Sequence, residues 1–183
     1  RRRHTRFRNV TGVQTCALPI LRETAFNWLD HLLERDWSGQ RCLDLFAGSG
    51  ALGFEAASRG AASVLMVEAL SIACKALQAT RDKLDAAQVE IRLADATSLL
   101  SSLSGPYELV FLDPPYGMQL LPSLLPSCRR LLAPGGLVYA ESDQSFAAGT
   151  ADWLSGWSPV RQGKAGAVHF ALLALMSPNP FRA

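Results

Sequence analysis

The chain has 183 residues, of which 49% are hydrophobic and 19% are charged. This length supports one domain with a full core, and this composition excludes a disordered chain. No apolar run is long enough to cross a bilayer, so the sequence predicts no membrane-spanning helix. We expect a cytoplasmic protein.

The basic charge of the chain is concentrated in its first residues. Residues 1–20 contain five arginines and no acidic residue, and this segment shows neither the alternation of a strand nor the stripe of a helix. Thirteen basic and sixteen acidic residues remain in the rest of the chain, although the formal net charge of the whole is +2. We expect residues 1–20 to be non-native or disordered and residues 21–183 to form a single domain.

From Leu21 onward, helical patterns alternate with short apolar runs that are typical of buried strands. The helical patterns cover residues 21–34, 51–58, 71–84, 96–103 and 120–132. The strand patterns cover residues 42–46, 63–68, 89–93, 107–112 and 137–141. Two more strands, 157–162 and 167–175, flank a turn at 163–166 and predict a terminal antiparallel hairpin. This order predicts an α/β fold with a mostly parallel, doubly wound sheet that helices cover on both faces.

The four cysteines, Cys16, Cys42, Cys74 and Cys128, are scattered along these elements. They form no C-x-x-C pair, and no histidine lies at ligand spacing from any of them. The pattern is typical of buried free thiols in a reducing compartment, so we expect no metal site.

Four of the predicted strands are followed by a distinctive residue: Gly48, Glu68, Asp95 and Asp113. Ligands of open α/β sheets bind where the carboxyl ends of the strands meet. We therefore expect these four residues to surround one site.

A glycine pattern, G-x-G-x-x-G, starts at Gly48 and leads into a predicted helix. Glu68 lies 20 positions later, where nucleotide-binding folds place an acid that binds a ribose diol. The pair fits either a dinucleotide or S-adenosylmethionine. Asp44, inside the first strand, favours S-adenosylmethionine, because a nearby carboxylate suits a cationic ligand better than a pyrophosphate. Asp95 is placed to accept from an adenine amino group, and it is equally suited to cap the following helix.

The stretch Asp113-Pro114-Pro115-Tyr116 follows a buried strand. Its carboxylate and a rigid carbonyl turn can accept the hydrogens of an amino group on a flat ring, and the aromatic side chain can cover the face of that ring. We expect this stretch to bind a methyl-accepting amine.

Together, Asp44-Leu-Phe-Ala-Gly-Ser-Gly50 and Asp113-Pro-Pro-Tyr116 resemble motifs I and IV of the amino-group methyltransferases that use S-adenosylmethionine. With Arg22-Glu-Thr-Ala-Phe-Asn-Trp28 and Val67-Glu68, they resemble the bacterial RsmD-like family, which methylates the exocyclic N2 of a guanine in 16S ribosomal RNA. The resemblance covers about residues 21–175 and implies a Rossmann-like methyltransferase fold. It also implies that the partner is ribosomal RNA or the assembling small ribosomal subunit.

The resemblance implies a role for each of these residues. Catalytic contacts to the guanine amine and base would come from Asp113, Pro114, Pro115 and Tyr116. The methionine end of S-adenosylmethionine would be held by Asp44, Phe46, Ala47, Gly48 and Gly50. Glu68 would bind the ribose hydroxyls, and Asp95 with the Ala96 amide would bind the adenine edge.

Other functions remain open at this point. Methyl transfer to adenine N6 or to a protein glutamine uses the same motif, although many such enzymes carry asparagine at the position of Asp113. A nicotinamide-dependent oxidoreductase and a non-catalytic cofactor-binding module are further alternatives. Residues 14–20 also depart from the Arg-Pro-Thr segment that usually precedes the Arg22-Glu-Thr24 helix in the family.

Overall fold

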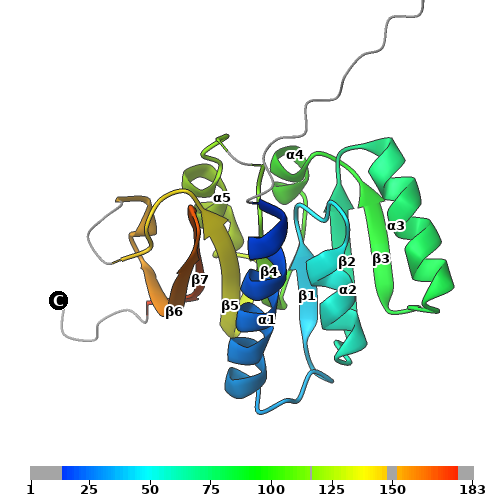
Figure 1. The fold of residues 1–183 in the computed structure, drawn as a ribbon, viewed down its shortest axis with the longest axis horizontal. Helices are drawn as coiled ribbons and strands as arrows, with labels where there is room; N and C mark the ends of the chain where they lie inside the picture. Colours follow the sequence, from blue (N-terminus) through cyan, green and yellow to red (C-terminus); the bar gives the residue numbers. More distant parts are fainter. Residues whose placement is uncertain (1–13, 116, 148–151, 177–183) are drawn as a thin grey trace, which may run out of the picture.

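A computed structural model of the chain describes residues 14–115, 117–147 and 152–176. These residues build a seven-stranded sheet with helices on both faces (Figure 1). The helices are α1 (Gln14–Leu32), α2 (Ala51–Ser58), α3 (Ser71–Lys83), α4 (Ala96–Leu100), α5 (Leu121–Cys128) and the 3-10 turn η1 (Asp152–Leu154). The strands are β1 (Arg41–Asp44), β2 (Ser63–Glu68), β3 (Val89–Leu93), β4 (Tyr107–Leu112), β5 (Leu132–Ser142), β6 (Trp157–Ala165) and β7 (Val168–Leu175). Across this part of the chain, no helix is both long enough and apolar enough to span a membrane.

The strand order is β3-β2-β1-β4-β5-β7-β6. Strands β1 to β5 pair in parallel, and β7 pairs antiparallel with both β5 and β6. The predicted doubly wound α/β sheet and its antiparallel terminal hairpin are thus confirmed. The order reverses between β1 and β4, which places a topological switch point, the usual ligand site of such folds, in the middle of the sheet.

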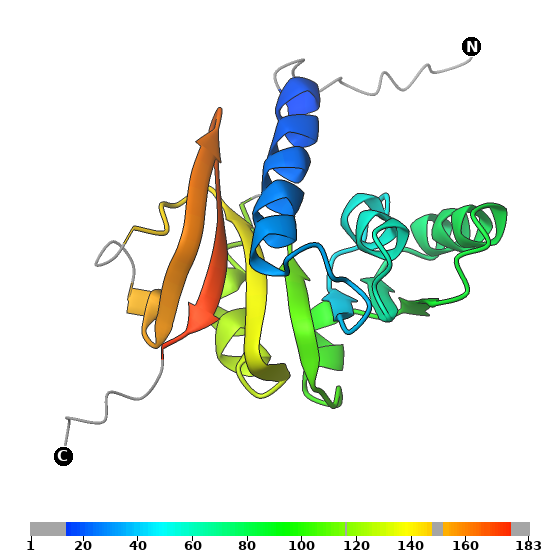
Figure 2. The ribbon, with the colours of Figure 1, turned by 90° about the horizontal axis from the view of Figure 1, so that it is seen from below.

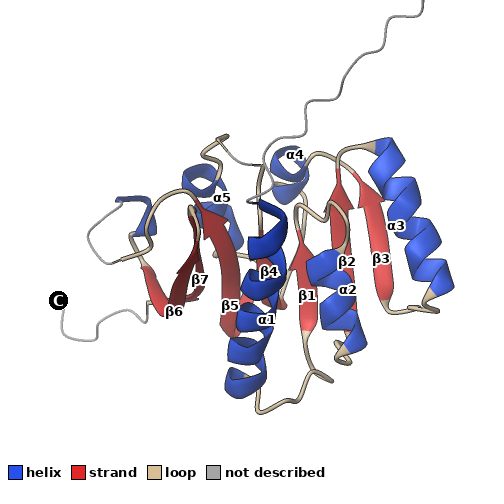
Figure 3. Ribbon diagram, viewed as in Figure 1, coloured by secondary structure: helices blue, strands red, loops and turns tan. Residues whose placement is uncertain are grey.

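Helices cover both faces of the sheet (Figure 3). The alternation of side chains along each strand divides the core into two layers. In β1, Leu43 packs with α4 and α5 on one face, whereas Cys42 packs with α1, α2 and α3 on the other. Strands β2, β4 and β5 contribute to both layers in the same way. Both faces are therefore dry, which explains why the inner strands read as continuous apolar runs.

Helix α1 is fixed to the sheet by aromatic contacts. Phe26 is fully buried, and its ring lies 5.7 Å from the ring of Trp37 and 5.9 Å from that of Phe111 on β4. Trp28 stacks on Phe170 of β7 at 5.1 Å. Seen from below, α1 therefore lies between the hairpin and the centre of the sheet (Figure 2).

The largest differences from the sequence-based prediction lie at the ends of elements. Helix α1 begins at Gln14, inside the segment that shows no helical stripe. Strand β5 begins at Leu132, where the prediction had a helix, and β6 continues to Ala165 through the predicted turn. Pairing with β4 and β7 supplies these extra residues with backbone partners, which a local pattern does not reveal.

The described cysteine side chains, Cys42, Cys74 and Cys128, are free and buried, as expected. Burial raises the pKa of the Cys42 and Cys128 thiols to about 12. These two thiols are therefore unreactive packing groups near neutral pH.

Substituting Phe26→Ala should destabilise the protein by about 3–5 kcal/mol, because it removes the aromatic ring that joins α1 to β4. Its neighbour Asn27 is exposed on the same helix, so Asn27→Ala should change the free energy of unfolding by less than about 0.5 kcal/mol. Urea unfolding followed by circular dichroism measures both values. Equal stabilities of the two variants would contradict this account of how α1 is held.

Candidate functional site

A cavity of about 810 Å³ opens where the parallel strands end. The loops after β1, β2, β3 and β4 form most of its wall, and Leu21 of α1 and the turn between β6 and β7 close one side. No lysine, arginine or histidine lies among the described residues that line it. The cavity is lined by Leu21, Leu45, Phe46, Gly48, Val67, Glu68, Ala69, Leu70, Ala94, Asp95, Ala96, Thr97, Asp113, Pro114, Pro115, Met118, Leu120, Glu141, Ala165, Gly166, Ala167 and Val168.

Asp44, the last residue of β1, lies beneath the glycine loop, residues 45–50. Only 1% of it is exposed. Its Oδ2 atom accepts a hydrogen bond of 3.2 Å from the N–H of Gly53 in α2, and its Oδ1 atom accepts a longer one of 3.4 Å from the N–H of Phe46. Burial raises the pKa of Asp44 to about 7, and the charges of Asp113 and Glu68 add to this while the two N–H donors oppose it.

Asp44 is not among the residues that line the cavity. It holds the glycine loop and α2 together from below, because it binds one backbone N–H of each. Its predicted place near a ligand amino group stays a prediction.

The glycine loop needs glycine at Gly50 for two reasons. Its φ is +81°, and a Cβ there would come within 2.6 Å of Leu77 and of the ring of Phe54. Gly48 also has a positive φ of +52° and places its backbone in the cavity wall. Ala47 ties the loop to β2, because its N–H donates to the carbonyl of Val67 at 2.9 Å. Gly50 and Ala47 thus shape the loop, whereas Gly48 and Phe46 reach the cavity.

Glu68 joins two loops at the cavity wall. Its Oε2 atom accepts a hydrogen bond of 2.9 Å from the N–H of Gly48, and its Oε1 atom accepts one of 2.7 Å from the N–H of Leu70. The carboxylate is therefore fixed in position at the end of β2, and its contact with a ribose diol stays a prediction.

Asp95 is the N-cap of α4. Its Oδ1 atom accepts a hydrogen bond of 2.9 Å from the N–H of Ser98, and this bond lowers the pKa of the carboxyl group. Asp95 and the following Ala96 both line the cavity, so the capping role and the predicted adenine-binding role are compatible.

Asp113, Pro114 and Pro115 follow β4 and line the cavity. Strand β1 lies between β4 and β2, the strand that ends at Glu68. Burial raises the pKa of the Asp113 carboxyl group to about 6. Tyr116, the fourth residue of the predicted motif, lies outside the described residues. The structure thus brings eight predicted site residues to one cavity: Phe46, Gly48, Glu68, Asp95, Ala96, Asp113, Pro114 and Pro115.

Glu141 is a site residue that the sequence reasoning missed. Leu112, the last residue of β4, pairs with Ala140 of β5. The residues that follow them, Asp113 and Glu141, therefore lie side by side. Glu141 is 7% exposed, and its Oε1 atom accepts a hydrogen bond of 2.7 Å from the Tyr139 hydroxyl. Burial, and then the charge of Asp113, raises the pKa of Glu141 to about 7, while the Tyr139 hydrogen bond opposes the rise. The position of Glu141 at the end of a predicted strand was the signal that could have found it.

A second, smaller cavity of about 40 Å³ adjoins the first. Both cavities are lined by Asp113, Pro114, Pro115, Leu120 and Glu141. The smaller one continues toward Gln144 and Trp153, beyond β5. The two carboxyl groups at the ends of β4 and β5 therefore stand where the two cavities meet.

Comparison with known proteins links this arrangement to one family. A profile of the family described as Conserved hypothetical protein 95 matches residues 15–174. Ribosomal RNA small subunit methyltransferase D of Escherichia coli K12 is 35% identical over 154 residues, which cover 83% of this chain and 75% of the relative.

The fold is shared with solved structures. The yhhF protein of Escherichia coli, described provisionally as a methyltransferase, matches with a TM-score of 0.74 and 33% identity, covering 84% of each chain. A SAM-dependent methyltransferase from Agrobacterium tumefaciens matches with a TM-score of 0.59 over 69% of this chain and 45% of that one. At 22% identity the second likeness concerns the fold alone. The architecture is thus that of S-adenosylmethionine-dependent methyltransferases, and the chain belongs to the family described as Conserved hypothetical protein 95, the RsmD family that its motifs resemble.

Proposed function

We propose that this protein transfers a methyl group from S-adenosylmethionine to ribosomal RNA, and that the acceptor is the exocyclic N2 of a guanine in the small-subunit RNA. The proposal rests on one observation: the same cavity is lined by Glu68 beside the glycine loop and by the Asp113-Pro114-Pro115 turn, here called the acid–proline corner. The relationship to a small-subunit methyltransferase supports the RNA substrate.

The cavity fits S-adenosylmethionine in shape and in charge. Its volume of about 810 Å³ lies in the range of sites for ligands of this size. The apolar residues Leu45, Val67 and Ala94 suit a flat base, and the fixed carboxylate of Glu68 can accept hydrogen bonds from a ribose diol. No cation lines the cavity among its described residues, so the positive sulfur and amino groups of the methionine end meet no repulsion there.

A dinucleotide fits the same cavity less well. Its pyrophosphate would need free backbone N–H groups at the start of α2. Here the N–H of Gly48 already binds Glu68, and the N–H of Gly53 binds the buried Asp44. Two carboxyl groups therefore occupy donors that a phosphate would use, and their charge repels it. We infer that a nicotinamide cofactor is not the ligand.

Asp113 and the Pro114 carbonyl are the groups that would hold the acceptor amine. The lone pair of a guanine amino group is delocalised into the ring, so the amine is a poor nucleophile. Acceptors on both of its hydrogens can turn the lone pair toward the methyl carbon, and such alignment can contribute about 7–11 kcal/mol to the rate. The bound cofactor supplies a methyl carbon on a positively charged sulfur that leaves as a neutral thioether.

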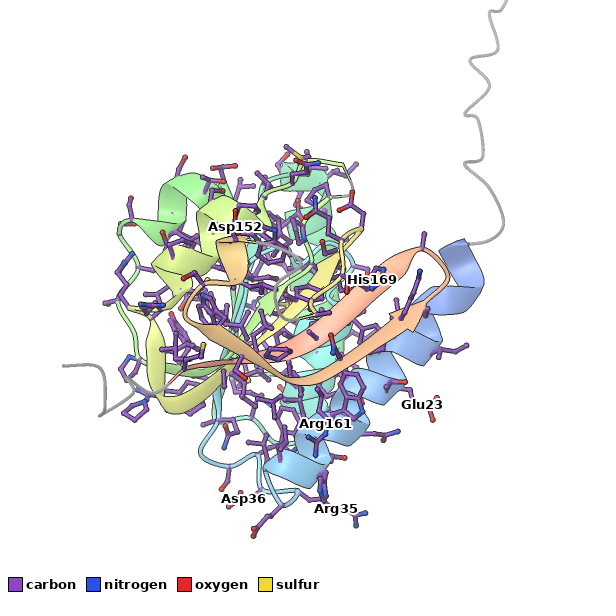
Figure 4. All side chains as sticks on the ribbon, turned by 90° about the vertical axis from the view of Figure 1, so that its left-hand side faces the viewer. Glu23, Arg35, Asp36, Asp152, Arg161 and His169 are labelled. Atoms are coloured by element: carbon purple, nitrogen blue, oxygen red, sulfur yellow. The ribbon has the colours of Figure 1, made fainter. Side chains whose placement is uncertain are left out.

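The buried amine of a paired base cannot reach this corner, so the target nucleotide must leave its stack, at a cost of a few kcal/mol. The cavity itself carries no cation among its described lining residues. Contacts to RNA phosphates must therefore come from its surroundings. Arg161 and Lys164 are exposed on β6 and are candidates for this role; Figure 4 shows the position of Arg161.

The proposal is tested with small ribosomal subunits from an Escherichia coli strain that lacks its own methyltransferase D. Incubation with the purified protein and labelled S-adenosylmethionine should label 16S RNA, and nuclease digestion should release the label as N2-methylguanine. Label in N6-methyladenine would contradict the guanine assignment. Label in protein or DNA, with none in RNA, would contradict the RNA substrate.

Substituting Glu68→Gln should weaken S-adenosylmethionine binding about tenfold or more, because a charged hydrogen-bond acceptor contributes about 1.5–3 kcal/mol. Glutamine keeps the volume but cannot accept bonds from both Gly48 and Leu70. Isothermal titration calorimetry measures the dissociation constant. Glu90→Gln, at an exposed acid on β3, is the matched control and should bind like the wild type. Wild-type affinity in Glu68→Gln would refute the role given to this carboxylate.

Substituting Asp113→Ala should lower kcat by about 10²–10⁴-fold while changing the cofactor dissociation constant only a few-fold, because Asp113 faces the amine and not the adenosine. Single-turnover methylation of the same ribosomal subunits measures the rate, and calorimetry measures the affinity. Asp152→Ala, at an exposed acid of η1 that lines neither cavity, serves as the control. An unchanged rate in Asp113→Ala would remove Asp113 from the mechanism.

A further inference from the structure

We propose that Glu141 is a second functional carboxyl of this site, a positioning residue that acts through Asp113 and shares with it the proton that the methylated amine releases. The inference rests on the proposed methyl transfer to an amine and deepens it. Its basis is the placement of Glu141 beside Asp113 where the two cavities meet.

Among the described residues, Glu141 has a hydrogen-bond donor but no cationic partner. The side chain is buried at the end of a central strand, where an acid is rare unless it is paired with a cation. No salt bridge to Glu141 occurs among the described residues. Its one described hydrogen bond comes from the Tyr139 hydroxyl to Oε1. Every fully buried polar side-chain atom among the described residues has a hydrogen-bond partner. We therefore infer that the other carboxyl oxygen is not fully buried and faces the two cavities that Glu141 lines.

The charged and titratable groups around Glu141 are mainly acidic. Asp113 lies beside it on β4, and Asp44 lies beyond Asp113 at the end of β1. Asp143, two residues later, lines the smaller cavity. The residue of β7 that lies opposite Glu141 is the apolar Phe170. The neighbouring His169 lies opposite Ser142 of β5 on one side and Lys164 of β6 on the other. In the described structure, Tyr139 is thus the group that stabilises the charged form of Glu141.

Two neighbouring buried carboxyl groups cannot both ionise easily, so they titrate as a pair. Burial, and then the charge of Asp113, raises the pKa of Glu141 to about 7. A proton acceptor works best when its pKa lies near the working pH. The pair can therefore bind a proton near neutral pH, whereas a single exposed aspartate, because of its low pKa, binds one only in acid.

The proposed step balances as follows. The nitrogen lone pair forms the new bond to carbon, and the electrons of the carbon–sulfur bond remain on sulfur. An N–H bond then breaks and returns its electrons to nitrogen, while the proton moves to an oxygen of Asp113 and is shared with Glu141. The pair loses the proton to water when the product leaves.

Two substitutions should shift the pH profile of single-turnover methylation in opposite directions. Glu141→Gln leaves Asp113 to titrate alone and not as one member of a carboxyl pair, so the acid limb should move to lower pH by about one unit. The rate on the plateau should fall about tenfold, because the remaining base is weaker. Tyr139→Phe removes the donor that stabilises ionised Glu141, so the pair keeps its proton to higher pH and the acid limb should move up.

Asp152→Asn is the charge control, and its profile should match the wild type. S-adenosylmethionine affinity, measured by calorimetry, should verify that each variant is folded. If Glu141→Gln lowers the rate equally at every pH, or if both variants shift the limb in the same direction, Glu141 is only structural and the inference is wrong. If the wild type itself does not methylate the RNA, the proposed function fails instead, so the two failures are distinguishable.

Discussion

The burial of Asp44 under the glycine loop is the constraint on which the rest of the site depends. A carboxyl group that is 1% exposed must find hydrogen-bond donors, and here it finds the backbone of the loop and of α2. Those bonds tie β1 to α2 and to the loop that contains the left-handed Gly48 and Gly50. The loop in turn offers the Gly48 N–H to Glu68, so one buried acid determines where the second one stands.

This arrangement separates two kinds of charge. Carboxyl groups collect at the carboxyl ends of the strands, inside the larger cavity, whereas the described basic side chains lie outside its wall. An acidic cavity attracts a cationic methyl donor and repels phosphate groups. A ribosomal RNA substrate would therefore be held by its backbone on the surrounding surface and would present only a neutral base to the cavity. The same separation argues against a pyrophosphate-containing cofactor at the start of α2.

The strands around the site could be predicted from the sequence because β2 and β4 are short, mostly apolar runs and β3 alternates apolar with charged residues. Much of the cavity wall could be predicted for a related reason, since Gly48, Glu68, Asp95 and Asp113 lie at the ends of strands or within a few residues after them. The length of β5 and the start of α1 could not, because they depend on pairing and packing with distant segments. That Asp44 lies below the loop, outside the cavity wall, is likewise a result of packing that spacing alone does not contain.

Glu141 shows what a motif-based reading leaves out. Motif residues are contiguous, whereas the partner of Asp113 is set by the parallel register of β4 and β5, which joins positions 28 residues apart. That register places two acids together in a region where water is largely excluded, and desolvation then weakens the acidity of both. A methyl transfer to an amine must end with the loss of a proton into the same region. A carboxyl pair that titrates near neutrality suits this requirement, because it can bind the proton without a large driving force and release it again to water.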